Sequence, residues 1–530
     1  MWGLLVLRLF VYKKDANQMS RHDNNEQIQT ILFQLSILII LLFFFLRICP
    51  VIPYDGDDWY FAGAMRWPFP LWGVFNPTKV LPETLEPFCG YIAAYLVYPI
   101  VGDYVASLSY VMGSCIAIIS FIFFLMLCLY LKKKHSVPYR KALAIELIVL
   151  LSMFLIFKQR NAESYYAFWS LDVNCCFNYV VPGLFNGIMV FALEIYNSSD
   201  NTKSQKTIIN SLLLAGTYFA VFSNIVLSII IAVYAATDFL ECVLQQLPNF
   251  KKIDRNYFLS RNKWNIGILI AWMVSLIYEF NGGRAKVVTS SSFWGNSFKD
   301  TLSQMNIFAN NINRVFGIIV IVIVVFAIIL SKINSTKGHS FDKRILSTIR
   351  KSFLVGIIIF IYLLLLFTKL GGNHATRPDC MWALQYVVYW IIAVSLAEIL
   401  TRFSQSNTII PLLVIIMTIS AFNLNNPFKS SNGGRDYMTC KAIDDYIINQ
   451  IVEADCEGLS YIEVKVPLEQ SDSNWPHPYN MAQWMQNTLY AHGMIHRRIT
   501  IVFVPDSSVN DLFYSCDGIQ MPPFYDLEAW

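Results

Sequence analysis

The sequence predicts a mainly α-helical, polytopic membrane protein, with a bundle of about eleven transmembrane helices followed by a small α/β domain outside the membrane. Of its 530 residues, 55% are hydrophobic and only 14% are charged, whereas soluble domains carry roughly 25% charged residues. The apolar residues form long runs, and Asp, Glu, Asn and Pro return in strength only after residue 424. The net charge of +4 gives no indication of nucleic-acid binding.

Long apolar runs predict the transmembrane helices, because a helix needs about 20 apolar residues to cross the hydrocarbon core. The segment before them, residues 1–29, starts with a short apolar run, becomes polar from Lys13 onward and is expected to be cytoplasmic. The sequence leaves open whether the chain starts at Met1 or Met19. The predicted spans are residues 30–49, 104–131, 142–158, 180–196, 207–222, 225–246, 265–280, 314–331, 353–369, 381–401 and 408–423.

Lysine and arginine predict the orientation of these spans, because short cytoplasmic loops are enriched in both. If eleven spans alternate, every strongly basic loop falls on one side, which is therefore cytoplasmic. The first loop, residues 50–103, and the tail, residues 424–530, then lie outside. The basic loops are residues 132–141, 203–206, 251–263 and 337–351.

The apolar segment 84–101 needs a separate interpretation. Counting it as a span would reverse every later loop and place the lysines of residues 132–134 outside. Its length is marginal for crossing, and its three tyrosines suit the level of the lipid headgroups. We therefore expect this segment to be a helix lying on, or partly in, the outer interface.

The tail combines helical and strand patterns. Residues 437–452 place apolar side chains at helical spacing, whereas residues 461–466 and 499–504 are short runs rich in β-branched residues. The sequence therefore predicts a small mixed α/β domain, residues 424–530, on the outer face.

The most unusual motif, Asp55-Gly56-Asp57-Asp58-Trp59-Tyr60, follows the first span almost directly. A membrane loop needs polar residues but not a concentrated group of carboxylates. A carboxylate can accept the proton of an attacking hydroxyl group, and carboxylates that lie close together can raise one another's pKa. The neighbouring aromatic rings of Trp59 and Tyr60 can stack on sugars. The alternative is that these acids belong to an ordinary solvated loop.

Two further outer loops carry candidate binding residues. Glu163 and Trp169 precede the fourth span, and His374 and Arg377 precede the tenth. An arginine at the membrane surface can hold a phosphate with its planar guanidinium group. The simpler alternatives are an interfacial aromatic belt for Trp169 and a snorkelling helix anchor for Arg377.

These features resemble the polytopic glycosyltransferases of the GT-C superfamily. Members of that superfamily carry an acidic pair in the first outer loop, which also contains interfacial helices, and many end in a soluble extracytoplasmic domain. Asp57-Asp58 matches the acidic pair, and residues 84–101 match the interfacial helix. The segment from Trp169 to Pro182 resembles bacterial Gtr-type enzymes, which modify O-antigen and other surface glycans. The resemblance covers residues 30–423, and the additional Asp55 departs from it.

The resemblance implies transfer of a sugar from a polyprenyl-phosphate-linked donor to a surface glycan or lipid-linked acceptor, with inversion, at the outer face of the bacterial cytoplasmic membrane. It implies Asp57 as the base, Asp58 as the residue that orients the acceptor or a cation, and Asp55 as a supporting acid. Arg377, with His374, would bind the donor phosphate. Glu163, Trp169, Trp59 and Tyr60 would bind substrate. No cofactor is required, although a divalent cation is compatible with the site.

Other functions remain open at this stage. A transporter or flippase of lipid-linked saccharides would place ionisable residues inside its spans, where Glu146, Glu194 and Glu398 are the few examples. A glycan polymerase or ligase would use similar donor chemistry but a large late outer loop. In a sensor or scaffold, the tail would bind a partner and the acids would be incidental.

Overall fold

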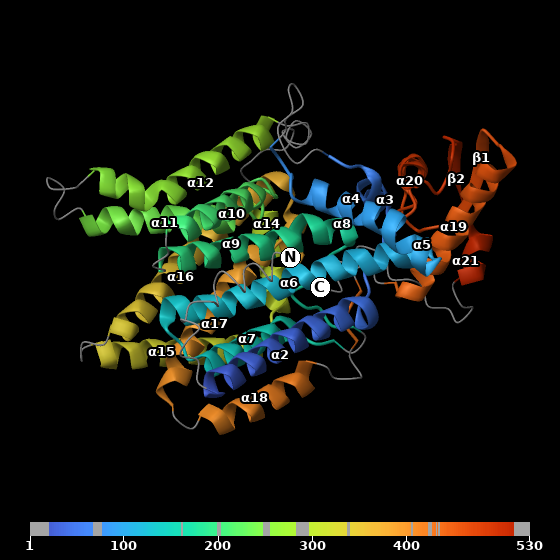
Figure 1. Ribbon diagram of the computed structural model, residues 1–530. Helices are drawn as coiled ribbons and strands as arrows, with labels where there is room; N and C mark the ends of the chain where they lie inside the picture. The colour runs from blue at the N-terminus through green and yellow to red at the C-terminus, as the bar shows by residue number, and fades with distance from the viewer. Residues whose placement is uncertain are drawn as a thin grey trace. The chain divides into compact units, whose positions relative to one another are not determined.

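The computed structural model describes residues 21–66, 77–160, 163–198, 203–246, 255–281, 296–335, 340–403, 406–421, 427–430, 432 and 435–513. The described chain is mainly helical and contains one two-stranded sheet (Figure 1). It divides into two compact units. Unit 1 comprises residues 1–41, 119–167 and 182–427, and unit 2 comprises residues 42–118, 168–181 and 428–530. Most of the predicted N-terminal segment, residues 1–20, lies outside the described residues.

Each predicted span coincides with a helix. A lipid-facing segment has no water to bond its backbone groups, so apolar runs rich in isoleucine and valine still become helical there. The helices are α2 (Arg21–Phe43), α6 (Tyr104–His135), α7 (Tyr139–Leu155), α9 (Val181–Asn197), α10 (Lys203–Val221), α11 (Ile229–Gln246), α12 (Arg255–Asn281), α15 (Arg314–Ser335), α16 (Ser340–Leu370), α17 (Trp382–Arg402) and α18 (Ser406–Ala421).

Seven helical segments of the described chain are long and apolar enough to cross a membrane. This finding supports the membrane class, whereas the number of eleven spans stays a prediction. Lys206–Val221 and Pro411–Ala421 are apolar but shorter. The seven segments are Ile28–Ile48, Pro82–Val101, Tyr104–His135, Val173–Asn197, Arg314–Ile333, Lys343–Leu370 and Trp382–Arg402.

The core of unit 1 is rich in aromatic rings. Trp390 of α17 donates a hydrogen bond from Nε1 to the Tyr130 hydroxyl of α6 at 3.1 Å. Tyr130 stacks on Phe191 of α9, with ring centroids 5.1 Å apart. Gly183 of α9 packs directly against the Trp382 ring. These contacts place α6, α9 and α17 at the centre of the unit.

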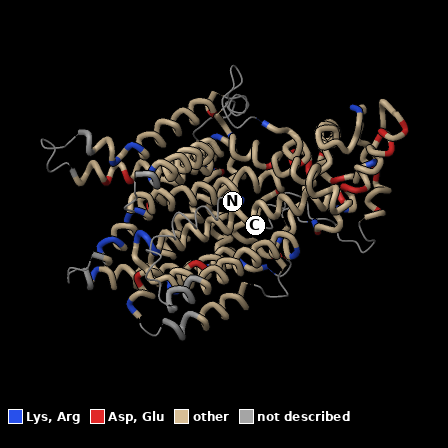
Figure 2. Tube along the Cα trace, in the orientation of Figure 1, with Lys and Arg blue, Asp and Glu red and all other residues tan. Residues whose placement is uncertain are grey.

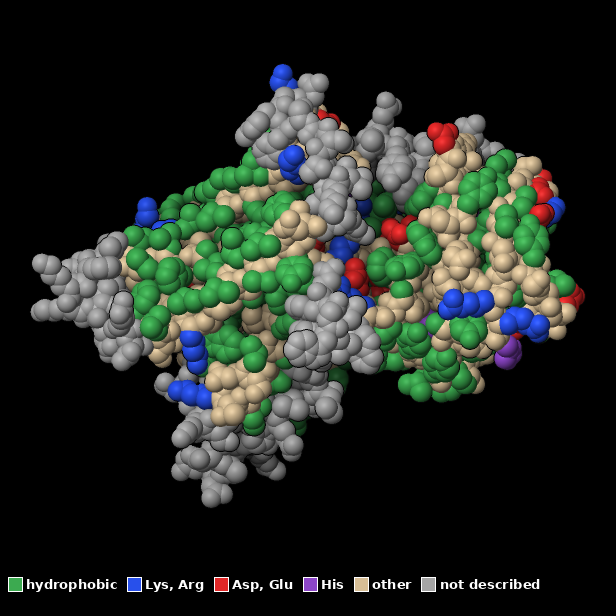
Figure 3. All heavy atoms as spheres, turned by 90° about the horizontal axis from the view of Figure 1, so that it is seen from above, with side chains coloured by type: hydrophobic (Ala, Val, Ile, Leu, Met, Phe, Trp, Pro, Cys, Tyr) green, Lys and Arg blue, Asp and Glu red, His purple; other side chains and the backbone are tan. Residues whose placement is uncertain are grey.

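The periphery of unit 1 is apolar. On α15, Val315, Ile318 and Ile321 are each more than 60% exposed. Figure 3 shows hydrophobic side chains spread over the face of the unit that includes α12. A monomeric soluble protein rarely exposes so large an apolar surface. Lipid chains are therefore the natural surroundings of these helices.

Lysine and arginine gather at one end of unit 1, around the end of α6 and the beginnings of α12 and α16 (Figure 2). The basic loops that the sequence assigns to the cytoplasm meet at this end. The arrangement within this unit therefore agrees with a single basic side.

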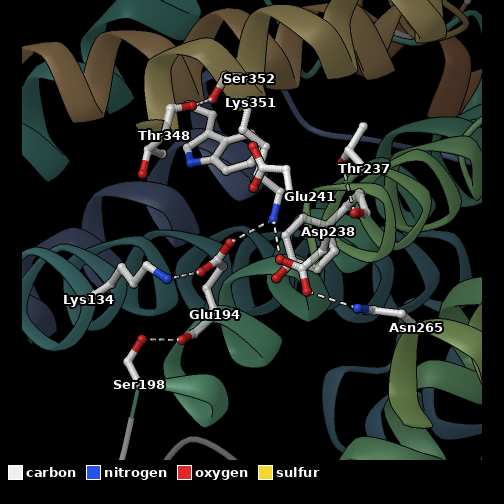
Figure 4. Close-up of polar contacts among 12 residues, drawn as sticks. Lys134, Glu194, Ser198, Thr237, Asp238, Glu241, Asn265, Thr348, Lys351 and Ser352 are labelled. Carbon is white, nitrogen blue, oxygen red and sulfur yellow. Dashed lines mark hydrogen bonds and ion pairs between the residues drawn. The ribbon is translucent and has the colours of Figure 1, made fainter. Parts of the chain in front are cut away.

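A buried ion-pair network joins helices near the same end (Figure 4). Lys351 of α16 pairs with Asp238 of α11 at 2.8 Å and with Glu194 of α9 at 3.3 Å. Lys134 of α6 pairs with Glu194 at 2.9 Å, and Asn265 of α12 donates to Asp238 at 2.8 Å. Two cations and two carboxylates from four helices thus neutralise each other, and the Asn265 amide links a fifth helix to them.

The tail of the chain forms the predicted α/β fold within unit 2. Its elements are α19 (Tyr437–Glu457), β1 (Tyr461–Pro467), α20 (Tyr479–Ala491), β2 (Thr500–Asp506) and α21 (Ser507–Phe513). The two strands pair in parallel, from Tyr461 opposite Thr500 to Pro467 opposite Asp506. Parallel pairing requires a crossover connection, and α20 lies in it. The predicted helix and both predicted strands are thus present.

The tail does not form a compact unit of its own. Unit 2 also contains α3 (Gly56–Gly63), α4 (Pro82–Ile92), α5 (Tyr98–Val101) and α8 (Val173–Cys175). The expected domain boundaries, 30–423 and 424–530, therefore differ from the compact units. The first outer loop and the tail fold together.

The segment expected at the interface is helical from Pro82 to Val101. It ends at Gly102, whose φ of +74° favours glycine. By length and composition it is also a candidate span, although the least hydropathic of the seven. Its interfacial placement stays a prediction.

Three segments of the described chain wind as π-helix, and all three lie in unit 2. They are Phe44–Ile48, Ala93–Val97 and Cys176–Val180. Such turns are rare and occur frequently at functional sites. The last of them corrects a sequence boundary, because residues 173–179, expected in a loop, already belong to the helix that continues as α9.

Candidate functional site

The acid motif forms the beginning of α3. Asp55 caps the helix, since its Oδ1 accepts a hydrogen bond from the Asp58 amide at 3.0 Å. Asp58 reaches back with Oδ2 to the Asp55 amide at 3.4 Å. This reciprocal capping box satisfies backbone donors that a helix start leaves free. It also separates the acids, because Asp58 is buried and Asp57 is exposed.

Asp58 is held by backbone donors from two distant segments. It is only 1% exposed. Its Oδ2 accepts from the Tyr54 amide at 2.9 Å, and its Oδ1 accepts from the Asn174 amide at 2.7 Å. Asn178 donates to the Asn174 carbonyl at 2.9 Å. Asp58 therefore joins the first outer loop to the beginning of α8 and acts as a positioning residue.

Two further carboxylates complete the acid cluster, which we define as Asp55, Asp57, Asp58, Glu86 and Asp172. Asp172 caps α8 by accepting from the Cys175 amide. Glu86 of α4 is fully buried, and neither carboxylate oxygen has a hydrogen-bond partner in the described chain. Lys79 supplies opposite charge to Glu86.

Burial and the neighbouring carboxylates raise the pKa values of Asp55 and Asp58. Burial raises the pKa of Asp55 well above its ordinary value, and the charges of Asp58 and Asp172 raise it further. Burial likewise raises the pKa of Asp58, with Asp172 and Glu86 adding to the effect. The amides of Asn174 and Tyr54 oppose that shift. Asp55 and Asp58 therefore favour their protonated forms more than exposed aspartates do.

We expect Asp55→Asn to raise the melting temperature at neutral pH and to weaken its pH dependence. A carboxyl with a raised pKa keeps its proton in the folded state after the unfolded chain has released it. Stability therefore falls as pH rises from the ordinary aspartate pKa of about 3.9 to the raised value. Asparagine keeps the cap acceptor but removes the charge. Melting curves from pH 4 to pH 8 measure the effect.

The comparison should use the difference between variant and wild type, because His477 and His492 titrate in the opposite sense. Burial lowers the pKa of both histidines, so their contribution to stability is lost as pH falls. Asp472→Asn, at an exposed aspartate of the same unit, is the matched control. Equal pH slopes for all three proteins would contradict the prediction.

Asp57 is the accessible acid of the cluster. It is exposed, and its carboxylate makes no hydrogen bond or ion pair with the described residues. Tyr60, one turn later, is 41% exposed. The Tyr60 ring meets Trp484 of α20 with centroids 5.6 Å apart. An unpaired carboxylate and two aromatic rings therefore share one surface of unit 2.

Trp59 has a different position from its neighbour Tyr60. It is fully buried, and its carbonyl accepts a hydrogen bond from the Thr488 hydroxyl group. Trp59 thus connects α3 to α20 of the tail through this hydrogen bond. Its ring has no open face for a sugar, so Tyr60 is the better candidate of the pair.

A buried ion pair fixes the residue before the motif. Arg435 donates from Nη2 to both carboxylate oxygens of Glu469, at 2.7 and 2.6 Å, and from Nη1 to the Tyr54 hydroxyl. The His477 ring packs edge-on against Tyr54 with centroids 5.0 Å apart. These contacts from the tail hold the loop that presents the acids.

The two remaining predicted substrate residues, Trp169 and Glu163, belong to different units. Trp169, in unit 2, is 4% exposed and donates from Nε1 to the Ser430 carbonyl at 3.3 Å. It serves packing in this structure. Glu163 belongs to unit 1 and is half-buried.

The donor-phosphate candidates also belong to unit 1. Arg377 forms a two-bonded pair with the buried Asp379, at 3.1 and 2.6 Å. His374 lies in the short 3₁₀ helix η5 (Gly372–Thr376). Burial and the charge of Arg377 lower its pKa. His374 is therefore neutral near pH 7 and offers a hydrogen bond rather than a charge.

Several site residues have weak sequence signals. Glu86 lies one turn after Pro82, a proline at a helix start, but nothing along the chain marks it as a neighbour of Asp55. Asp172 precedes an apolar run as a helix cap does. Trp484 and Asn174 carry no signal, because only the tertiary fold brings them to α3.

Among the described residues, no group of three or more His, Cys, Asp or Glu side chains is arranged to hold a metal ion. No family model matches the chain, and comparisons with curated proteins and with solved structures find no match. The geometry of the site is therefore the basis for any functional proposal.

Proposed function

We propose that the chain is a membrane glycosyltransferase that moves a sugar from a polyprenyl-phosphate-linked donor to a surface glycan or lipid-linked acceptor. The observation that carries the proposal is the surface around α3. There the carboxylate of Asp57, which makes no ion pair with the described residues, adjoins the buried acids Asp55 and Asp58. The exposed Tyr60 ring and the half-exposed Trp484 ring lie nearby, in a chain with many apolar helices.

In the proposed reaction, an acceptor hydroxyl oxygen attacks the anomeric carbon of the donor sugar. The bond from that carbon to the phosphate oxygen breaks, and the lipid phosphate leaves with the electron pair. Asp57 accepts the hydroxyl proton as general base. One displacement of this kind inverts the anomeric centre. Asp58 and Asp55 hold Asp57 in place, and a divalent cation is compatible with the acids but not required.

Arg377 remains the proposed ligand of the donor phosphate, with His374 as a hydrogen-bond donor beside it. The proposal requires the phosphate to share or displace Asp379, because Asp379 already occupies two donors of the guanidinium group. The basic loops along the sequence are the reason for proposing the outer face of a bacterial cytoplasmic membrane as the side of the reaction.

Donor turnover tests the proposal. Purified protein in nanodiscs is given a panel of undecaprenyl-phosphate sugars, and release of the lipid phosphate is measured. We expect Asp57→Asn to lower turnover at least a hundredfold, since general bases contribute roughly 10²- to 10⁴-fold, while Asp472→Asn matches wild type. If no donor turns over, or if the two variants behave alike, the proposal fails.

A transporter or flippase of lipid-linked saccharides is the second candidate. The buried charges of unit 1 favour it, because ionisable groups at membrane depth often mark transport paths. However, Lys134, Lys351, Glu194 and Asp238 neutralise each other in direct pairs. A closed, balanced network holds helices together more readily than it carries a substrate, so surface chemistry remains the better supported function.

A further inference from the structure

Helix α20 has an unusual composition for a helix of the polar tail. Its sequence, from Tyr479 to Ala491, contains no Asp, Glu, Lys or Arg. Exposed helix surfaces normally carry charged side chains. Here amides take their place: Asn480, Gln483 and Asn487 are all exposed. The exposed surface of the helix therefore carries neutral hydrogen-bonding groups that a ligand could contact.

One side of α20 combines these amides with a large aromatic ring. Asn480, Trp484 and Asn487 follow one another at spacings of four and three residues, which places them in one row on the helix. Trp484 is half-exposed. The row thus presents an indole flanked by two side-chain amides, each with donors and an acceptor.

The row lies next to the acid motif. A β-carbon on Gly56 would be 3.0 Å from Cζ3 of Trp484, so the indole lies directly against the residue that precedes Asp57. Tyr60 meets the same indole at 5.6 Å between centroids. Glycine at position 56 is what allows this close approach.

The chemistry of this surface selects one class of ligand. A phosphate or an acidic peptide would need cations, and α20 has none. A protein partner would be expected to meet a larger apolar area than this row offers. A sugar ring has apolar C–H faces that stack on an aromatic ring and hydroxyl groups that bond to amides. The combination of a half-exposed indole and flanking amides fits a neutral saccharide.

We propose that Asn480, Trp484 and Asn487 of α20, together with Tyr60, form the binding subsite for a neutral acceptor sugar next to Asp57. This inference rests on the proposed function, because it assigns the acceptor of the same site. It also gives the tail a role, since the tail would hold the acceptor chain while α3 supplies the base.

Binding can be measured apart from transfer. Full-length protein carrying Asp57→Asn, in nanodiscs, is titrated by calorimetry with maltopentaose, cellopentaose and mannopentaose, and with tetragalacturonate as an anionic probe. We expect at least one neutral probe to bind and Trp484→Ala to weaken it roughly three- to tenfold, the usual worth of an aromatic contact. Trp484→Phe should restore most of the affinity, because it keeps an aromatic face.

Tyr479→Ala is the matched control, because Tyr479 is a 62% exposed aromatic residue on another side of the same helix. It should leave binding unchanged, and melting curves check that every variant folds. If no neutral probe binds, if only tetragalacturonate binds, or if Trp484→Ala matches Tyr479→Ala, the subsite is refuted.

The two proposals fail in different ways. Saccharide binding through Trp484 without turnover of any donor would leave the subsite standing and refute the transferase. Donor turnover that depends on Asp57, with binding indifferent to Trp484, would refute the subsite and leave the transferase standing.

Discussion

Replacing Lys351 by methionine is expected to destabilise unit 1 by about 3–5 kcal/mol, the usual effect of removing one partner from a buried ion pair. The Lys351 side chain is 6% exposed and pairs with both Asp238 and Glu194. Its ammonium group also lies over the Tyr234 ring, 4.1 Å from the centroid. Without it, Asp238 would lose its ion-pair partner in this network, and the buried Glu194 would keep only Lys134.

A second substitution should recover much of that loss. Asp238→Asn in the Lys351→Met background leaves one cation and one carboxylate, Lys134 and Glu194, and an amide oxygen can still accept from Asn265. The double variant should therefore be more stable than Lys351→Met alone, with a coupling of about 1–3 kcal/mol. Thermal melting in detergent and titration with a denaturing detergent measure all three proteins.

Lys343→Met is the matched control, since Lys343 is an exposed lysine of the same helix. It should change stability by less than about 0.5 kcal/mol. If Lys351→Met lowers the stability no more than this control does, water must already reach the charges of the network. The transporter interpretation would then gain ground over the transferase.

This network shows where sequence reasoning reaches its limit. The apolar runs predict each helix, because hydropathy along the chain is a local property. The sequence shows Glu194 as an isolated charge inside a span. However, its partner Lys351 belongs to a predicted cytoplasmic basic loop, and no sequence pattern marks Asp238. The pairing depends on how α9, α11 and α16 pack, which no local pattern records.

The acid motif was predicted in a similarly partial way. Asp55, Asp57 and Asp58 are adjacent in the chain, so their grouping was visible. The capping box, which buries Asp58 and exposes Asp57, follows from the helix that begins at Gly56. Trp59 and Tyr60 were assigned the same role, but consecutive positions on a helix point in different directions. The structure buries one and exposes the other.

The tail illustrates the opposite case. Short runs of β-branched residues predict its strands, and helical spacing predicts its first helix. Its relation to the first loop was not, because Thr488 and Trp484 meet α3 only after more than 400 intervening residues. Long-range packing of this kind decides which residues surround Asp57.

Gly90→Ala is expected to remove activity and to destabilise unit 2 by at least 1–3 kcal/mol, the range for forced overpacking. A β-carbon at position 90 would overlap the backbone carbonyl of Ala62 in α3, and it would approach the ring of His492, the residue directly after α20, at 3.0 Å. Backbone cannot move aside as a flexible side chain does. Helix α4 would have to withdraw from α3.

The withdrawal would also disturb the acid cluster, because Gly90 lies one helical turn after Glu86 on the same side of α4. The close contact at Gly90 holds α4 against α3, and α4 carries the buried Glu86 carboxylate, which interacts electrostatically with Asp172, Asp55 and Asp57. We therefore expect the variant to lose donor turnover more completely than its change in melting temperature alone would explain.

Gly317→Ala separates this effect from the general effect of alanine in a helix. Gly317 lies in α15, where a β-carbon would meet no atom within 4 Å. Alanine there should stabilise the helix by up to about 1 kcal/mol. Opposite signs for the two substitutions would show that α3 and α4 meet through backbone contact at Gly90. If both substitutions changed the stability in the same direction, the close contact at Gly90 would not be what holds α4, with Glu86, against α3.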